Sequence, residues 1–368
     1  MAPVTVVILA PARDPGAAPL ARVLEDARAW LADELTTALR GLPRPPGLVL
    51  RRDTGGRPFG AWLREMAAET TREAAGGAPG GLVVLGAGSV PLARREDLDA
   101  FLGAAAADEP GALANTFYSA DIVAVAQAAR TLADVPADLA ADNALPRWLA
   151  EVAGVPIRDL RGRRHLAVDV DSPLDLVLLE DARPGIPVPG PEDSGPVRTR
   201  LDALRALARD PAAELLLAGR TSAADLARVE RGSRARTRAL IEERGLRTAQ
   251  LGEALGRPNR RPPRSLLGEL LVRDGPGRLG ALVADLADGA LIDTRVLIAA
   301  RAGTDERAWP TPEDRFASDL LLPDRVRDPW LRALTEGVAD APVPIVLGAH
   351  TLVGPGAPLA LGLDGATG

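Results

Sequence analysis

The sequence contains no cysteine, which excludes disulfides, thiolate catalysis, iron–sulfur clusters and cysteine-ligated zinc sites. It also contains no lysine, so all 44 basic residues are arginine. Schiff-base chemistry and a Walker-type phosphate lysine are therefore excluded. The two histidines, His165 and His350, are too few for a metal cage built from several imidazoles. Carboxylates, arginines, hydroxyls and backbone groups must supply most of the chemistry.

Three other shortages narrow the class of protein. Aromatic residues make up 3% of the chain, which leaves little for stacking on nucleic-acid bases. The formal net charge of −6 disfavours a nucleic acid as the main partner. No apolar run reaches the roughly 18 residues of a membrane span, and residues 1–30 lack the pattern of a signal peptide. We therefore expect a cytoplasmic protein without a membrane partner.

The first half of the chain alternates strand-like and helix-like segments. Short apolar runs, typical of buried strands, occur at Val4–Leu9, Leu48–Leu50 and Leu82–Leu85. Helical spacing of apolar residues separates them, as in Ala17–Leu42. This rhythm predicts an α/β fold, a three-layer αβα sandwich with a mainly parallel sheet, over residues 1–182.

A boundary is expected after this domain. Residues 183–197 hold five prolines and three glycines, which predicts a semi-rigid linker rather than a helix. Helical spacing dominates residues 198–368, with one strand candidate at Pro344–Leu347. With 368 residues the chain is long enough for two domains, and we expect a mostly helical second domain to which the sequence assigns no role.

Two segments of the second half carry weaker signals. The arginine-rich stretch Thr221–Leu246 fits a helix-turn-helix that contacts DNA phosphates, or an ordinary solvated helical face. His350 lies in a glycine-bracketed loop after the strand candidate. It could transfer a proton near neutral pH, or simply form a structural hydrogen bond.

The strongest chemical signal is the segment Asp169-Val170-Asp171-Ser172-Pro173-Leu174-Asp175-Leu176. If Leu166–Val170 is a strand, Asp169 and Asp171 project from one face near its carboxyl end. Two carboxylates placed there could share Mg²⁺, which prefers hard oxygen ligands. The alternative is a strand-to-helix turn in which Ser172 caps a helix that begins with Pro173.

This segment resembles the D-[IV]-[DN]-T-P-E-D-L signature of nucleotidyltransferases typified by the molybdenum-cofactor guanylyltransferases and 2-phospholactate guanylyltransferases. A second match is Val84-Leu85-Gly86-Ala87-Gly88-Ser89-Val90-Pro91-Leu92-Ala93, which is similar to the family's L-x-G-D-x-P-L. The resemblance covers residues 1–182. It implies a glycosyltransferase-A type sandwich, nucleotide binding, and Mg²⁺ held by Asp169 and Asp171, which would then be the catalytic residues.

The chain departs from this family on the side that handles the nucleotide. The family's first loop carries a glycine pair and a later lysine, whereas this chain has Pro11-Ala12 and Arg13. Proline has no amide hydrogen to donate to a phosphate. Ser89 stands where the family has a metal-binding aspartate. These differences indicate either an inactive relative or a phosphate site that has moved.

A moved phosphate site has one candidate, Arg51–Gly60, which follows the second strand. Gly55 and Gly56 would let backbone amides turn toward an anion, and Thr54 and Arg57 could add donors. The alternative is a tight turn that needs glycine for its backbone conformation.

One further loop, Asp142–Trp148, could place Asn143 near a nucleotide, although Asp142 and Asn143 are also typical helix caps. Taken together, the sequence predicts transfer of a nucleoside monophosphate from a triphosphate to a small phosphorylated acceptor. Arg57, with Arg13 or Arg52, would replace the absent lysine on the leaving phosphates. The alternatives are an inactive nucleotide- or partner-binding member of the same fold, or a DNA-binding regulator.

Overall fold

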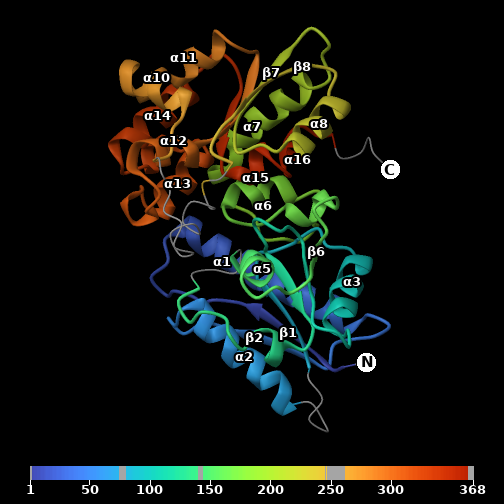
Figure 1. Ribbon diagram of the computed structural model, residues 1–368. Coiled ribbons are helices and arrows are strands. Elements are labelled where there is room, and N and C mark those ends of the chain that lie inside the picture. The colour runs from blue at the N-terminus through green and yellow to red at the C-terminus, as the bar shows by residue number, and fades with distance from the viewer. Residues whose placement is uncertain (1, 74–79, 140–143, 245, 247–261, 364–368) are drawn as a thin grey trace. The chain divides into compact units, whose positions relative to one another are not determined.

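The structure is a computed structural model that describes residues 2–73, 80–139, 144–244, 246 and 262–363. Contacts divide the chain into two compact units. The first is built mainly from Met1–Pro15 and Asp26–Asp169, and the second mainly from Gly16–Glu25, Val170–Gln250 and Pro258–Gly368. Each unit contains a sheet with helices (Figure 1), which confirms the predicted α/β class.

The sheet of the first unit has six strands in the order β2-β1-β3-β5-β4-β6. β5 is antiparallel to both of its neighbours, and the other strands run parallel to one another. The carboxyl ends of the parallel strands therefore share one edge. The strands are β1 (Val4–Leu9), β2 (Leu48–Arg52), β3 (Gly81–Gly86), β4 (Ala112–Ala114), β5 (Ile122–Val125) and β6 (Ile157–Asp159).

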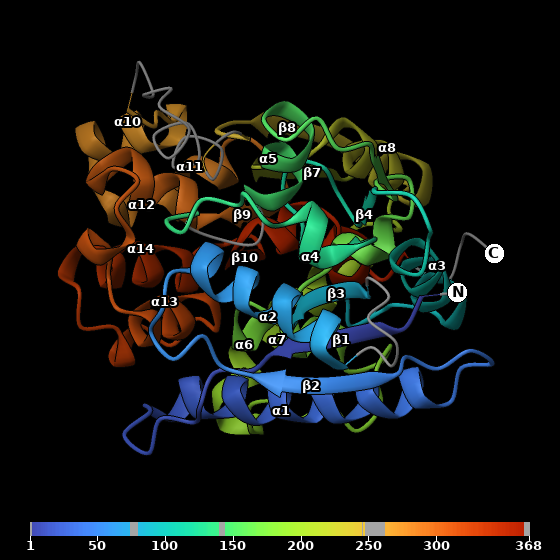
Figure 2. The same cartoon turned by 60° about the horizontal axis from the view of Figure 1, so that its bottom comes forward.

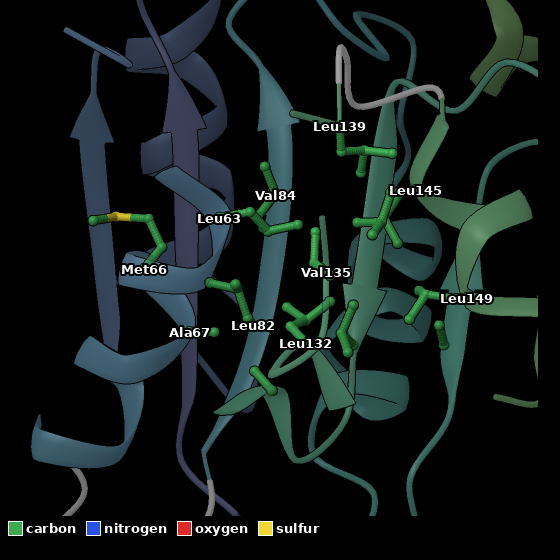
Figure 3. Packing of buried hydrophobic residues seen from close by; sticks show 14 of the residues in the cluster. Leu63, Met66, Ala67, Leu82, Val84, Leu132, Val135, Leu139, Leu145 and Leu149 are labelled. Atoms are coloured by element: carbon green, nitrogen blue, oxygen red, sulfur yellow. The ribbon is translucent and has the colours of Figure 1, made fainter. Parts of the chain in front are cut away.

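Alternate residues of the central strands feed two separate cores, one on each face of this sheet. On one face, Leu82 and Val84 of β3 pack with Leu63 and Met66 of α2 (Figure 3). On the other face, Val83 belongs to the core that α1 and α3 cover. Figure 2 shows α1 and α2 on opposite faces of β1 and β2. The helices are α1 (Pro19–Arg40), α2 (Phe59–Glu73), α3 (Arg95–Ala105), α4 (Ala128–Thr131) and α5 (Leu145–Glu151).

The sequence predictions for this unit hold where apolar runs are long. β1 has the predicted bounds, and β2, β3 and α1 lie within two residues of the predicted segments. The strand predicted at Leu166–Val170 is wrong. A short 3-10 helix, Arg164–Ala167, occupies its first part. Asp169 takes part in strand pairing through an isolated bridge with Ser89 rather than through a strand.

The second unit contains a four-stranded parallel sheet in the order β10-β9-β7-β8. Strands β7, β9 and β10 are mostly apolar and buried along their length, as is typical of a parallel sheet covered on both faces. The strands are β7 (Glu214–Gly219), β8 (Arg236–Ile241), β9 (Gly289–Asp293) and β10 (Ile345–Gly348). The helices are α6 (Pro173–Leu179), α7 (Pro191–Leu207), α8 (Ala223–Gly232), α10 (Leu266–Asp274), α11 (Leu279–Ala284), α12 (Thr294–Ala302), α13 (Pro312–Asp319), α14 (Pro329–Ala339), α15 (His350–Val353) and α16 (Ala357–Ala360).

Three sequence expectations fail in this unit. Leu215–Leu217 belongs to strand β7, because a short apolar run fits a buried strand as well as a helix. The second helix of the expected helix-turn-helix is strand β8, which lies beside β7 as an edge strand (Figure 1). The helix α7 begins at Pro191, inside the expected linker 183–197, because proline is tolerated in the first turn of a helix.

The remaining expectation for this unit, the strand at Pro344–Leu347, is confirmed by β10. Within the described ranges, no helix combines the length and the apolar stretch needed to cross a bilayer.

Candidate functional site

The segment Asp169–Asp175 has the local structure that its capping residues predict. Ser172 precedes the first residue of α6, Pro173, and has an extended backbone conformation. The carboxylate oxygen Oδ2 of Asp175 accepts hydrogen bonds from the backbone N–H groups of Asp171 (3.0 Å) and Ser172 (2.7 Å), and from the Ser172 hydroxyl (2.9 Å). Asp175 therefore fixes the backbone that carries Asp171.

Asp175 is itself an unusual carboxylate. Its side chain is buried, with 1% relative exposure, and Oδ1 has no hydrogen-bond partner among the described residues. Burial raises the pKa of Asp175 to about 7, and the neighbouring Asp171 carboxylate adds to this rise. A buried acceptor without a donor costs free energy, so a proton or a cation near this carboxylate would be stabilising.

Asp169 is placed by the sheet of the first unit rather than by a strand of its own. It pairs with Ser89 in an antiparallel bridge, and Ser89 follows the carboxyl end of β3. The Ser89 hydroxyl accepts a hydrogen bond from the N–H of Gly86 at 3.1 Å. Ser89 and Asp169, one residue from each of the two sequence motifs, therefore meet at this edge of the sheet.

The segment before Asp169 is held by a buried carboxylate of α3. Asp97 accepts hydrogen bonds from Arg163 (2.7 Å) and pairs with His165 (2.8 Å). Burial alone would raise the pKa of Asp97, but the hydrogen bonds from His165, the Arg94 amide and Arg163 lower it. Asp97 stays ionised and anchors this turn, so His165 has a structural role.

A histidine joins the predicted carboxylate pair. Asp171 and His350, both in the second unit, each offer a ligand atom, and so does Asp169, which is joined to Asp171 through Val170. These three atoms lie within 4.8 Å of one another and could hold a metal ion. The sequence predicted Asp169 and Asp171 as a pair. It did not connect them with His350, because nothing in sequence spacing links residues so far apart.

His350 follows β10 on the carboxyl edge of the second sheet, where other polar residues gather. Asp293 ends β9 and Arg220 follows β7. The Arg220 guanidinium donates to Asp293 through Nε (2.6 Å) and Nη2 (3.1 Å). Burial alone would raise the pKa of Asp293, but Arg220, with smaller contributions from His350 and Arg295, lowers it. Asp293 is therefore a fixed negative charge whose field reaches His350.

A second buried ion pair supports this edge. Arg295, in the first turn of α12, donates to Asp319 through Nη1 and Nη2, each at 2.6 Å. The side chains are 9% and 0% exposed. Burial alone would lower the pKa of Arg295, but the Asp319 carboxylate outweighs it and raises the pKa. The pair fixes α12 to α13 and leaves Arg295 charged near Asp175.

The topology of the second sheet points to the same place. From β7 the chain moves to β8 on one side and then to β9 on the other, so the direction of winding changes between β7 and β9. Ligands of open α/β sheets bind at the carboxyl ends of the strands that flank such a switch point. Arg220 and Asp293 occupy those two strand ends. Sequence reasoning missed both, because β7 was interpreted as part of a helix.

The predicted phosphate-binding arginines of the first unit are exposed at the ends of strands. Arg13 lies in the loop after β1 and forms an ion pair with Asp26 at 2.8 Å. Arg52 is the last residue of β2 and donates to the carbonyl oxygen of Arg51 at 3.2 Å. The carboxyl ends of β1 and β2 share an edge with that of β3. The structure thus places Arg13, Arg52 and Ser89 along one edge, and no direct contact joins them among the described interactions.

The glycine turn after β2 has the backbone that glycine permits. Gly55 and Gly56 have φ values of +62° and +74°, and an added Cβ at either would meet nothing within 4 Å. Arg57 donates to the carbonyl oxygen of Thr54 at 2.9 Å and pairs with Glu65. The turn is therefore an exposed loop closed by its own arginine. The last predicted residue, Asn143, lies outside the described residues.

Comparison with known proteins adds no relative to this picture. No protein-family model matches the sequence, and no curated protein matches it closely enough to count as a relative.

Proposed function

We propose that the chain is a nucleotidyltransferase-like enzyme that transfers a nucleoside monophosphate from a nucleoside triphosphate to a small phosphorylated acceptor. A phosphate oxygen of the acceptor attacks the α-phosphorus, the bond from that phosphorus to the bridging oxygen of the β-phosphate breaks, and pyrophosphate leaves. One observation carries the proposal: the turn that contains Ser89 pairs with Asp169, two residues before Asp171.

The carboxylates of Asp169 and Asp171 would hold a divalent cation, for which the sequence resemblance implies Mg²⁺. A cation bound there supplies charge that neutralises phosphate oxygens. The residues present fit such an ion, because their ligand atoms lie within 4.8 Å of one another. Asp175 is buried beside Asp171, its Oδ1 has no partner among the described residues, and a cation bound nearby would favour its ionised form.

Arginines of the first unit would bind the phosphates that leave. Arg13 and Arg57 form ion pairs whose side chains are between 44% and 66% exposed. Exposed ion pairs contribute only about 0–1 kcal/mol each, so each guanidinium can exchange its carboxylate for a phosphate oxygen at small cost. Arginine also binds phosphate through two parallel hydrogen bonds.

A second candidate function is nucleotide binding without turnover. Ser89 supports it, because this hydroxyl already accepts the Gly86 amide and replaces a carboxylate in the resembling motif. A hydroxyl holds a divalent cation more weakly than a carboxylate does. The two candidates share a binding step and differ only in the release of pyrophosphate.

The test measures binding and chemistry separately on the full chain. Each nucleoside triphosphate, with Mg²⁺ or Mn²⁺, is first titrated by calorimetry, and pyrophosphate release is then followed with a panel of small phosphorylated acids. Asp171→Asn should reduce release at least 100-fold. The matched control is Asp305→Asn, which removes an exposed partner of Arg307 in another part of the chain.

Three results are decisive. Release that Asp171→Asn abolishes and Asp305→Asn leaves unchanged supports the enzyme. Triphosphate binding without release supports the second candidate. No binding of any triphosphate overturns both.

A further inference from the structure

The candidate metal centre contains a nitrogen donor, and this changes which cation it fits. His350 begins α15, directly after β10, and its ligand atom lies within 4.8 Å of those of Asp171 and of Asp169. Two atoms bound to one ion at about 2.1 Å can be at most about 4.2 Å apart. Side-chain movements of less than an ångström therefore bring these ligand atoms to coordination distance.

Independent observations in the second unit indicate that a positive charge belongs here. The carboxylate of Asp175, whose Oδ2 holds the Asp171 amide, is almost completely buried, and its Oδ1 has no partner among the described residues. Asp293 adds a second buried carboxylate on the side of β9, but Arg220 already balances its charge. A bound cation would therefore compensate mainly for Asp175 and for the carboxylates of Asp169 and Asp171.

The backbone places Asp293 close to His350. Asp293 is the partner of Gly348 in the register of β9 and β10, and His350 follows Gly348 by two residues. The hydroxyl of Thr294 donates to the Gly348 carbonyl at 3.2 Å, which ties the two strand ends together. Both carboxylate oxygens of Asp293 accept hydrogen bonds from Arg220, so Asp293 acts on His350 through its charge. A negative charge beside a metal-binding histidine raises its basicity as a ligand, and in this sense Asp293 is a positioning residue.

We infer that His350 and Asp171, with Asp169 next to Asp171 in the chain, bind a first-row transition-metal dication such as Mn²⁺ or Zn²⁺ in preference to Mg²⁺. Imidazole nitrogen suits transition metals, whereas Mg²⁺ selects oxygen donors and gains little from a histidine. The inference deepens the proposed function by naming its cation, and it rests on that function in taking Asp171 as a ligand.

The experiment uses the metal-stripped full chain at one pH and measures binding without any substrate. Mn²⁺, Zn²⁺ and Mg²⁺ are titrated separately by calorimetry. Pulsed electron paramagnetic resonance of the Mn²⁺ complex then tests for coupling to an imidazole nitrogen. We expect Mn²⁺ to bind at least 10-fold more tightly than Mg²⁺ and to show that coupling.

The chain offers a matched control, because it has only two histidines. His350→Gln should remove the nitrogen coupling and weaken Mn²⁺ binding at least 10-fold, with little change in Mg²⁺ binding. His165→Gln should keep the nitrogen coupling, since His165 pairs with Asp97 and is not one of the three proposed ligands. Asp293→Asn should weaken Mn²⁺ binding roughly 10- to 100-fold and alter the coupling, whereas a merely structural role would leave the coupling of the bound fraction unchanged.

Equal affinity for Mn²⁺ and Mg²⁺, or a Mn²⁺ complex of the wild-type chain without nitrogen coupling, overturns the inference. The wild-type measurement suffices even if a variant fails to fold. The outcome is separate from that of the proposed function: nitrogen-coupled Mn²⁺ without triphosphate binding removes the nucleotidyl transfer and leaves the metal site. Conversely, pyrophosphate release that depends on Asp171, together with a Mn²⁺ complex that lacks nitrogen coupling, supports the nucleotidyl transfer and removes the inference about His350.

Discussion

The two units place their charges differently on the carboxyl edges of their sheets. In the first unit, Arg13 and Arg57 pair with acids while keeping 66% and 46% of their side chains exposed. In the second unit, Arg220 and Arg295 are 11% and 9% exposed, and their carboxylate partners are fully buried. The same residue types thus form loose pairs on one edge and fixed pairs on the other.

This difference separates two uses of arginine. An exposed pair is screened by water and contributes little, so its guanidinium remains available to a phosphate ligand. A buried pair has already lost its hydration, so removing one partner leaves an uncompensated charge. We therefore expect substitutions of the exposed arginines of the first unit to change ligand binding and to have little effect on the free energy of unfolding. Substitutions in the buried pairs of the second unit should mainly lower the free energy of unfolding. The following predictions test this contrast.

The largest effect is expected from breaking the buried pair of the second unit. Asp319→Ala leaves the Arg295 guanidinium buried without its partner, which should lower the free energy of unfolding by about 3–5 kcal/mol. Urea unfolding of the full chain, followed by circular dichroism, measures this loss. The double variant Arg295→Met with Asp319→Leu replaces the pair with apolar groups and should recover most of it. A loss below about 1 kcal/mol for Asp319→Ala would contradict the contrast.

The second prediction concerns pH. Burial raises the pKa of Asp175 from 3.8 to about 7, so the folded state binds a proton more tightly than the unfolded chain. Its contribution to stability is fully present below pH 4 and is lost as the pH rises through 7. Between pH 4 and pH 8 the loss should reach about 4 kcal/mol.

The measurement compares urea unfolding of the metal-free wild type with that of Asp175→Asn, which cannot titrate. As the pH rises, the free energy of unfolding of the wild type should fall relative to that of Asp175→Asn. A difference that stays constant from pH 4 to pH 8 would show that Asp175 titrates normally.

The third prediction concerns close backbone contacts, which occur in both units. A Cβ at Gly280 would lie 2.0 Å from the Gly337 carbonyl oxygen, and one at Gly60 would lie 1.9 Å from that of Pro136. Gly280→Ala and Gly60→Ala should each destabilise the chain by about 1–3 kcal/mol.

The control for these glycines is a helical position with open space. An added Cβ at Gly103 in α3 meets nothing within 4 Å. Gly103→Ala should therefore raise stability by up to about 1 kcal/mol. Thermal unfolding of the three variants is sufficient, and a destabilised control would show that α3 has less space at this position.

The smallest effect is expected at the first edge. Arg57→Ala removes the exposed pair with Glu65 and should change the free energy of unfolding by about 1 kcal/mol or less. The same variant should weaken triphosphate binding measured by calorimetry. A large loss of stability without a change in triphosphate binding would show that the Arg57–Glu65 pair is structural, like the buried pairs of the second unit.

Local sequence patterns predicted much of the first unit and part of the site. Val4–Leu9 and the Ser172-Pro173-Asp175 cap were predictable because a buried strand and a helix start depend on neighbouring residues. β7 was not predictable, because a short apolar run fits two structures and only its pairing with β8 and β9 decides. The pairs Arg220–Asp293 and Arg295–Asp319 could not be predicted from spacing, since tertiary contacts create them.

The sequence alone determined the available chemistry: without cysteine or lysine, any site had to be built from carboxylates, arginines, hydroxyls and at most two imidazoles. It also singled out Asp169 and Asp171, which are separated by one residue, although the strand that was expected to bring their carboxylates together is absent and the fold places them near each other instead. Only the tertiary structure decided that His350 lies beside Asp171, and that Asp175 is buried with an oxygen lacking a partner. Burial and long-range proximity depend on which strands pair, and that choice is made by packing across the whole unit.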